Sequence, residues 1–294
     1  MKKLFKTVVN FVAVATLAVA TLGMAACEDV KKLELDLSLY NYTDSAFYAG
    51  DDVKFSVDLY RHLAPKTVDE IIKHVKNGYY NDAVFYQEMG YSSQIMMGDL
   101  KFENGELKQN LIDGKLPSQI YGEFENNGTT GSNLVNESGS IGLWRSWYES
   151  NNNTYKTSNA MDSGRATWFI PTVELSGYNG YFCVFAQYDK DETANAKAIS
   201  AIKSILSDNS TEYVIYFTGE YDVNKPDENF GLTFHAVLKA DFDEDYDEDE
   251  NTFGGETVFT AEGAQLVCFN KRTVKIPNAV NGESSAKVKK ITVK

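Results

Sequence analysis

The sequence predicts a mainly β protein in which an antiparallel sheet closes into a barrel and two helices cap it. Three observations predict this fold class. Leucines alternate with polar residues near the N-terminus, which is the period of a half-buried strand, at Leu33, Leu35, Leu37 and Leu39. Two later segments space their apolar residues with the period of a helix. Beyond Ser207, short runs of β-branched and aromatic residues return.

A second strand and the first helix follow this N-terminal strand. The strand is indicated by alternating apolar residues at Val53, Phe55, Val57 and Leu59, and the helix by an apolar face of Val68, Ile71, Ile72 and Val75. We expect Thr67 to cap the helix while Glu70 reaches back to it, as in a capping box. Pro65 cannot lie inside the helix, and Gly78 suits its left-handed C-terminal end.

The second helix is predicted between Glu192 and Leu206, with an apolar face of Ala198, Ile199, Ile202, Ile205 and Leu206. After it we expect strands at residues 213–218, 232–238, 257–260, 265–269, 273–276 and 287–293. Residues 241–250 contain eight carboxylates in ten positions, which favours a solvated acidic loop. Loose Ca²⁺ binding is the alternative, but the run lacks the spacing of an EF-hand loop.

The N-terminus reads as an export signal. Lys2, Lys3 and Lys6 precede an apolar run at residues 8–20, and Met-Ala-Ala at 24–26 precedes Cys27, which resembles a bacterial lipobox. We therefore expect a signal peptide at 1–26, lipidation of Cys27, a tether at 27–32 and a folded domain at 33–294. That domain carries an acidic insertion at about 207–271. An ordinary cleaved signal and an uncleaved anchor are the alternatives.

The composition excludes several function classes. The chain has 28 Lys and Arg against 42 Asp and Glu, a formal net charge of -14, and loss of the leader with its three lysines takes this to -17. This balance argues against a protein that tracks nucleic-acid phosphates. His62, His74 and His235 lack metal-ligand spacing and are expected to be solvated, so we expect no cofactor. Cys183 and Cys268 are expected to be buried free thiols, with a disulfide between them as the alternative.

Short blocks between about residues 51 and 205 occur in the order of one enzyme family. They are Ala-Pro-Lys-Thr-Val at 64–68, Gly-Tyr-Tyr-Asn-Asp at 78–82, Phe85, Met-Gly-Asp at 97–99, Gly-Glu-Phe at 122–124, Asn-Gly at 127–128, Gly-Ser-Ile-Gly-Leu at 139–143, Trp-Phe-Ile at 168–170, Leu-Ser-Gly at 175–177 and Val-Phe at 184–185. Together they resemble the cyclophilin-type peptidyl-prolyl isomerases. The resemblance implies a cyclophilin-like closed antiparallel barrel of eight strands with a helix over each open end, and residues 287–293 as its last strand.

The resemblance also assigns a site. Gln87 stands where the family has its catalytic Arg. The positions implied at the substrate are Phe85, Tyr86, Gln94, Met96, Trp144, Thr167, Phe169 and Phe182. Residues 93–96 are aligned only by counting back from Asp99, because the segment that begins at Phe85 is one residue longer than in the family. An amide lacks the charge and fixed fork of Arg, so a loss of about 2–3 kcal/mol would slow the reaction by roughly 30- to 150-fold.

Each assignment has a simpler alternative. Phe169 and Phe182 are equally explained as barrel core, and Gln87 as an exposed strand residue without a role. Trp144 stands where the family has a small residue, so it could fill and block the proline pocket. Arg145 or Arg165 could replace the lost charge.

The favoured function is therefore a peptidyl-prolyl isomerase with weakened activity that assists the folding of exported proteins. Its expected partners are proline-containing unfolded or extended polypeptides. It is expected to be a monomer, extracytoplasmic, and held to the membrane through its lipid anchor alone. Two alternatives stay open: a non-catalytic cyclophilin-like module that binds peptides as a chaperone, and a surface lipoprotein whose insertion has an unrelated binding role.

Overall fold

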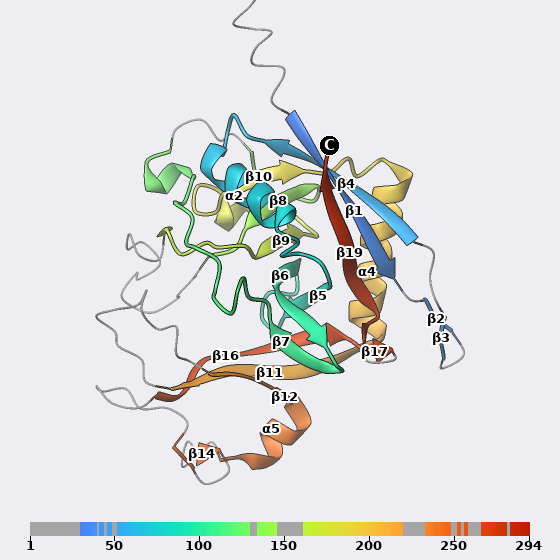
Figure 1. The fold of residues 1–294 in the computed structure, drawn as a ribbon, viewed down its shortest axis with the longest axis vertical. Coiled ribbons are helices and arrows are strands. Elements are labelled where there is room, and N and C mark those ends of the chain that lie inside the picture. Colours follow the sequence, from blue (N-terminus) through green and yellow to red (C-terminus); the bar gives the residue numbers. More distant parts are fainter. Residues whose placement is uncertain are drawn as a thin grey trace, which may run out of the picture.

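The computed structural model describes residues 30–39, 41–43, 46–48, 52–129, 134–145, 161–219, 233–247, 252–253, 256–257, 266–280 and 283–294. Eight of its strands form a closed antiparallel ring, which confirms the predicted barrel (Figure 1). In ring order they are β5 (Ala83–Glu88), β19 (Ala286–Val293), β1 (Val30–Leu39), β4 (Asp52–Tyr60), β10 (Val184–Gln187), β8 (Ser140–Leu143), β9 (Trp168–Pro171) and β6 (Gln94–Glu103). Pairing of β5 with β6 closes the ring.

The strands predicted from alternation lie side by side in this ring. β1 pairs with β4 along its length, and its four leucines are at most 3% exposed. On its other edge β1 pairs with β19, which is the predicted C-terminal strand. The ring therefore joins the two ends of the folded domain, and it depends on a pairing across nearly the whole chain.

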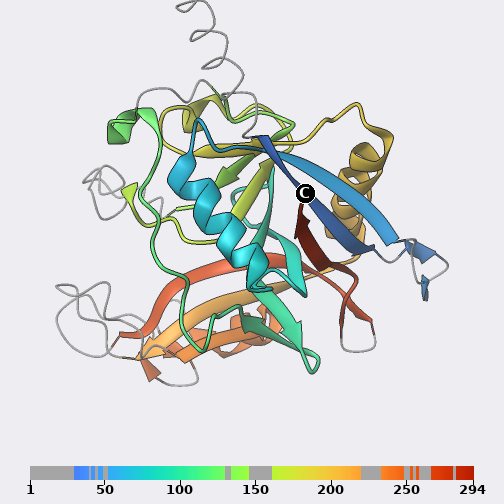
Figure 2. The same cartoon turned by 45° about the horizontal axis from the view of Figure 1, so that its top comes forward.

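Two helices lie on opposite sides of the ring, as predicted (Figure 2). They are α2 (Pro65–Lys76) and α4 (Thr193–Asp208). Their apolar faces enter the same interior core, through Val68 and Ile71 of α2 and through Ala198 and Ile202 of α4. The barrel interior is thus sealed by one helix on each side.

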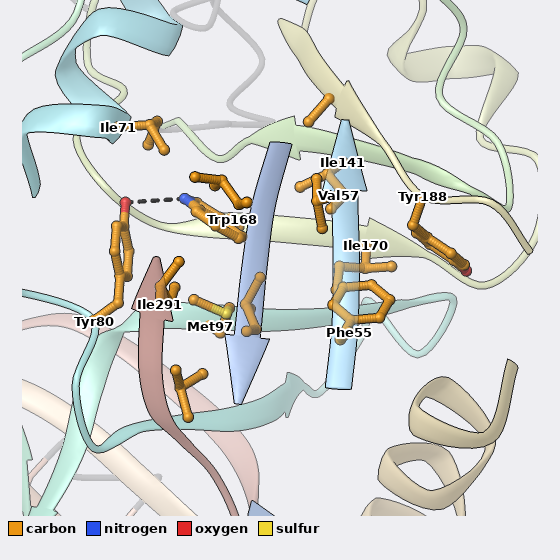
Figure 3. Close-up of a cluster of buried hydrophobic side chains, with 14 of the residues drawn as sticks. Phe55, Val57, Ile71, Tyr80, Met97, Ile141, Trp168, Ile170, Tyr188 and Ile291 are labelled. Atoms are coloured by element: carbon orange, nitrogen blue, oxygen red, sulfur yellow. Dashed lines mark hydrogen bonds between the residues drawn. The ribbon is translucent and has the colours of Figure 1, made fainter. Parts of the chain in front are cut away.

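The interior core includes a hydrogen-bonded aromatic pair (Figure 3). Trp168 donates its indole N–H to the Tyr80 hydroxyl at 2.9 Å, and that hydroxyl donates to the carbonyl of Ala166 at 3.0 Å. Burial raises the pKa of Tyr80 well above its usual value, so the hydroxyl keeps its proton. The polar atoms of both rings are therefore satisfied inside the apolar core.

The start of α2 differs from the predicted capping box. The helix begins at Pro65, and the residue before it makes no side-chain cap. The Glu123 carboxylate, which is 3% exposed, instead accepts the backbone N–H groups of Lys66 at 3.0 Å and Thr67 at 2.7 Å. A carboxylate suits the positive end of the helix dipole. The cap thus comes from a distant loop, which local spacing cannot reveal. Gly78 does adopt the predicted left-handed conformation, with φ of 71°.

His74 was expected to be solvated, and this is wrong. The side chain is 2% exposed and packs against Tyr79 and Tyr80, with ring centroids 5.5 and 6.5 Å away. Neither ring nitrogen has a hydrogen-bond partner among the described residues. Burial lowers the pKa of His74, against a smaller opposing effect of Glu70, so the ring stays neutral in the folded protein.

We expect His74→Leu to raise the free energy of unfolding by about 1 kcal/mol at pH 7.5, because a buried polar group without partners is lost. An unfolded His takes up a proton below about pH 6.5, whereas buried His74, whose pKa is lowered, does so only at lower pH. Wild-type stability is therefore full above that pH and falls as the pH drops, so the advantage of the variant should grow to about 2 kcal/mol at pH 5.5. Urea unfolding at both pH values measures this, with exposed His62→Gln as the control. A pH-independent difference would contradict it.

The C-terminal region adds a second curved sheet that is continuous with the ring. β16 (Leu266–Pro277) pairs with β5 on one edge and β11 (Ser210–Gly219) on the other, and β12 (Thr233–Leu238) pairs with β11. The two short strands predicted at 265–269 and 273–276 are thus one strand. On the far side, β7 (Glu106–Gln109) pairs with β6 and approaches β12. The insertion therefore folds against the outer face of the barrel (Figure 1).

The acidic run at 241–250 is only partly a loop. Its first half lies in α5 (Lys239–Asp245), where Lys239 pairs with Asp243 one turn later. Phe242 is 1% exposed and packs on Tyr216 of β11, with centroids 5.8 Å apart. The expected solvated loop is wrong for this half, because one aromatic residue anchors the segment. Residues 248–250 lie outside the described residues.

The remaining elements are short: β2 (Asn41–Thr43), β3 (Ala46–Tyr48), η1 (Glu125–Asn127), η3 (Ser176–Tyr178), β13 (Tyr246–Asp247), β14 (Thr252–Phe253), β15 (Glu256–Thr257), β17 (Ala279–Val280) and β18 (Glu283–Ser284). Cys183 is a buried free thiol, as predicted, and burial raises its pKa to about 12. The side chain of Cys268, the leader and Cys27 lie outside the described residues. Within the described part of the chain, no helix has the length and apolarity to cross a membrane.

Candidate functional site

One row of side chains crosses the outer face of the barrel on four neighbouring strands. Tyr86 of β5 pairs with Met96 of β6, Met96 with Phe169 of β9, and Phe169 with Gly142 of β8. Paired residues on adjacent strands point to the same face. Gly142 ends the row, because a Cβ there would lie 2.2 Å from the Phe169 ring. The register alone thus assembles three of the predicted site residues.

Aromatic side chains cover Phe169, which is fully buried. Trp144 approaches it edge-on at 6.0 Å and stacks on Phe182 at 5.3 Å. Tyr178 of η3 also stacks on Phe182, at 4.5 Å, and meets Phe169 edge-on at 5.7 Å. Tyr91 also meets Trp144 edge-on, with ring centroids 5.5 Å apart. The protein's own aromatic rings therefore cover Phe169, one of the positions that the resemblance assigns to the substrate.

Two predicted site residues do not join this face. Phe85 is fully buried in the barrel interior, because strand side chains alternate and its neighbour Tyr86 points outward. The same alternation places Gln87 on the side of Phe85. Its amide donates to the carbonyl of Ser92 at 2.7 Å, within the turn that links β5 to β6. Gln87 thus brings neither a charge nor its side chain to the outer face.

Gln94 lies on the outer face, two residues before Met96 on β6 and opposite Pro171 of β9. It is 1% exposed, yet neither atom of its amide group has a hydrogen-bond partner among the described residues. Buried amides are nearly always paired, and one left unpaired costs about 1–3 kcal/mol. Among the described residues, both the donor and the acceptor of the Gln94 amide are therefore unpaired.

The remaining predicted positions flank the cover. Half-buried Thr167 directly precedes β9, and its carbonyl accepts the backbone N–H of Trp144 at 2.8 Å. Arg145 is 3% exposed and lies over the ring of Phe182 at 4.8 Å, and burial lowers its pKa to about 10. Arg165 donates to the carbonyl of Pro117. Of the two arginines considered as replacements for the lost charge, Arg145 is thus the one beside the aromatic cluster.

A further arginine, Arg272 of β16, reaches the other end of the row. Its guanidinium lies over the Tyr86 ring at 5.5 Å and donates to the Tyr86 hydroxyl at 3.2 Å. It also donates to Asp99 at 2.6 Å and to Glu88 at 3.4 Å. Sequence reasoning missed this residue because β16 lies outside the segments that carry the family resemblance. Arg272 lies two residues from buried Val274, and this spacing was a usable signal that its side chain faces the barrel and not solvent.

Nothing in this arrangement resembles a nucleophile with its base or a metal centre. In the described ranges, no group of three or more His, Cys, Asp or Glu side chains could hold a metal ion. The outer face brings together aromatic rings, an amide and a guanidinium, but Tyr86, Met96, Phe169 and Gln94 are at most 1% exposed. Such groups could bind an apolar ring and hydrogen-bond to a peptide backbone only after the side chains that cover them move away.

The closed barrel, its two helices and this aromatic outer face define a cyclophilin-like protein. The family model described as "Cyclophilin type peptidyl-prolyl cis-trans isomerase/CLD" matches residues 46–216, more than half of the chain. The chain therefore belongs to the cyclophilin-type peptidyl-prolyl cis-trans isomerase family. The matched span ends within β11, so β12 and β16 lie beyond it.

Similar solved structures include a cyclophilin type peptidyl-prolyl cis-trans isomerase of Cryptosporidium parvum, with 13% identity over 57% of this chain and 83% of that chain and a TM-score of 0.35. The same enzyme in the presence of the dipeptide Ala-Pro gives 14% identity over 56% and 83%, also with a TM-score of 0.35. No curated protein matches the sequence significantly.

Proposed function

We propose that the protein is a peptidyl-prolyl cis-trans isomerase of low activity that acts on extended, proline-containing polypeptides. The observation that carries the proposal is the register that brings Tyr86, Met96 and Phe169 together on the outer face. Rotation about an X–Pro bond has a barrier near 18–20 kcal/mol, because amide resonance must be broken. Lowering it requires a surface for the proline ring and donors that favour the twisted amide.

Low activity follows from two features of the site. Gln87 supplies no charge, and its amide is bonded to Ser92 on the other side of the strand. The floor ring, Phe169, is covered by Trp144 and Tyr178, so a peptide must displace them to reach it. Each aromatic contact contributes about 0.5–1.5 kcal/mol beyond its buried area. The displacement therefore opposes substrate binding.

The cellular role that we propose is assistance to the folding of exported proteins. It rests on the leader at 1–26 and on Cys27, which would be lipidated and hold the protein at the outer face of the cell membrane. X–Pro isomerisation is a slow step in folding, so an isomerase suits that place. Mass spectrometry of the mature N-terminus tests the anchor, and an unmodified Cys27 would refute it.

The activity is tested by NMR exchange spectroscopy of an Ala-Pro peptide with the mature protein. We expect measurable but weak acceleration of cis/trans exchange by the wild type. We expect Gln87→Arg to raise the rate by less than about threefold, because this position points away from the outer face. A gain of the roughly 30- to 150-fold that a cation in contact with the substrate could supply would contradict this placement.

The second candidate is a non-catalytic binding module, and the covered state of Phe169 favours it. Such a module would hold extended chains without turning the X–Pro bond. Peptide-induced shifts in the protein spectrum without any exchange enhancement would select it over the isomerase. If the peptide causes neither spectral shifts nor exchange enhancement, both functions are refuted.

A further inference from the structure

The end of the barrel at which β1 begins carries an excess of positive charge. Lys32 of β1 lies opposite Asp58 of β4, and its carbonyl accepts the backbone N–H of Lys294 at 2.8 Å. The segments that meet here are 30–32, 58–69 and 292–294, and we call them the cationic end. Their two carboxylates are Asp58 and Asp69, and their five cationic side chains are Lys31, Lys32, Arg61, Lys66 and Lys294. The formal charge of this end is therefore +3, in a chain that is acidic overall.

The surplus charge lies on exposed lysines. All five cations except Arg61 are exposed. Arg61 binds Asp69 at 2.7 Å, and Lys32 lies 3.6 Å from Asp58. The hydrogen bond from Arg61 lowers the pKa of Asp69, and the charge of nearby Lys31 lowers it further. Both carboxylates of the cationic end are thus already balanced by cations, and the remaining lysines face solvent.

An exposed tyrosine lies beside this end. The ammonium group of Lys66 lies 4.0 Å from the centre of the Tyr121 ring, and Tyr121 is 40% exposed. Tyrosine is enriched at membrane interfaces, because its ring is apolar at one end and polar at the other. Lys66 and Tyr121 therefore present a cation and an apolar ring side by side, which suits the headgroup region of a bilayer.

The tether and the charge distribution both favour one orientation at a membrane. Three residue steps separate Cys27 from Val30, the first residue of β1, and they span at most about 11 Å. The helix α5, with exposed Asp241 and Asp243, lies at the opposite end of the molecule (Figure 1). An anionic surface repels a mature chain of charge -17 in any orientation that brings its acidic parts close. The approach by the cationic end is the favourable one.

We propose that the cationic end is a binding surface for anionic lipid headgroups, which orients the barrel with β1 and β19 toward the bilayer and the second sheet away from it. The assignment rests on the proposed function, because the tether is the lipid anchor proposed at Cys27. A Lys or Arg close to an anionic membrane strengthens binding by roughly fivefold. The lysines thus add to the lipid anchor and fix the direction in which the barrel stands.

The first test is co-sedimentation of the mature chain, without lipid, with vesicles of phosphatidylcholine alone or mixed with phosphatidylglycerol. We expect binding to the anionic vesicles only, at an ionic strength of about 0.01 M, where screening is weak. Lys31→Gln/Lys32→Gln should weaken this binding by about tenfold or more. The matched control is Lys115→Gln/Lys203→Gln, because both lysines are exposed and lie outside the cationic end, and it should change binding by less than twofold. Absence of binding to anionic vesicles, or equal losses in the two double variants, would overturn the proposal.

The second test separates this surface from the anchor. The lipidated protein is reconstituted into the same two kinds of vesicle and treated with a water-soluble reagent that acylates lysines. We expect Lys31 and Lys294 to react several-fold more slowly on anionic vesicles than on zwitterionic ones, and Lys115 and Lys203 to react equally on both. Equal rates for all four lysines would refute the surface and leave the anchor standing. If Cys27 carries no lipid but the mature chain binds anionic vesicles as expected, the anchor is refuted and the surface stands.

Discussion

Trp144→Ala should tighten the binding of an Ala-Pro peptide by about tenfold and raise the exchange rate at low peptide concentration by a similar factor. In the wild type the indole stacks on Phe182 and meets Phe169 edge-on, so a proline ring must displace it. Two aromatic contacts contribute on the order of 1.4 kcal/mol together, and this corresponds to a factor of ten in affinity. NMR titration gives the affinity, and exchange spectroscopy gives the rate.

Trp144→Phe is the matched control, because a smaller ring keeps the stack. We expect its affinity to lie within about twofold of the wild type. The sequence assigned Trp144 to the substrate site, with a filled and blocked proline pocket as the alternative, and the indole lies against the Phe169 ring. Weaker binding by Trp144→Ala would show that the indole holds the substrate and would contradict the role of a cover. Unfolding curves of both variants separate these effects from a loss of stability.

The barrel could be predicted because the sequence patterns that specify its strands and helices are local and repeated. Strict alternation at Leu33 to Leu39 identifies β1, and helical spacing identifies α2 and α4. The closure by β19 could be predicted only from the family resemblance, since its partner β1 lies some 250 residues away in sequence. Local patterns carry no information about such a pairing.

The features that sequence reasoning missed are set by tertiary contacts. Glu123 caps α2 from a distant loop, and two tyrosines bury His74 on a helix that reads as exposed at that position. Sequence reasoning was limited in the same way at the site. The resemblance showed that Gln87 replaces the family's Arg. It did not show that the Gln87 side chain lies on the same side of β5 as buried Phe85, away from the outer face. Arg272 could not be aligned at all, because it comes from an added sheet.

Gly98→Ala should lower the free energy of unfolding by about 3 kcal/mol or more, the largest stability effect that we predict. Gly98 has φ of 120°, which costs an L-residue roughly 1–2 kcal/mol. An added Cβ would also lie 2.5 Å from the Ala166 carbonyl oxygen, the acceptor of the Tyr80 hydroxyl. Backbone atoms cannot yield as a flexible side chain does, so this overlap should add about 1–3 kcal/mol.

Gly90→Ala isolates the first of these contributions. Its φ is 91°, and an added Cβ there would have nothing within 4 Å. Urea unfolding should therefore show a loss of about 1–2 kcal/mol for Gly90→Ala and a clearly larger one for Gly98→Ala. Equal losses would mean that β6 and the segment before β9 can move apart at Ala166. In that case Asp99, the next residue after Gly98, would also be free to shift, and the position of Arg272 over Tyr86 would not be fixed by the barrel.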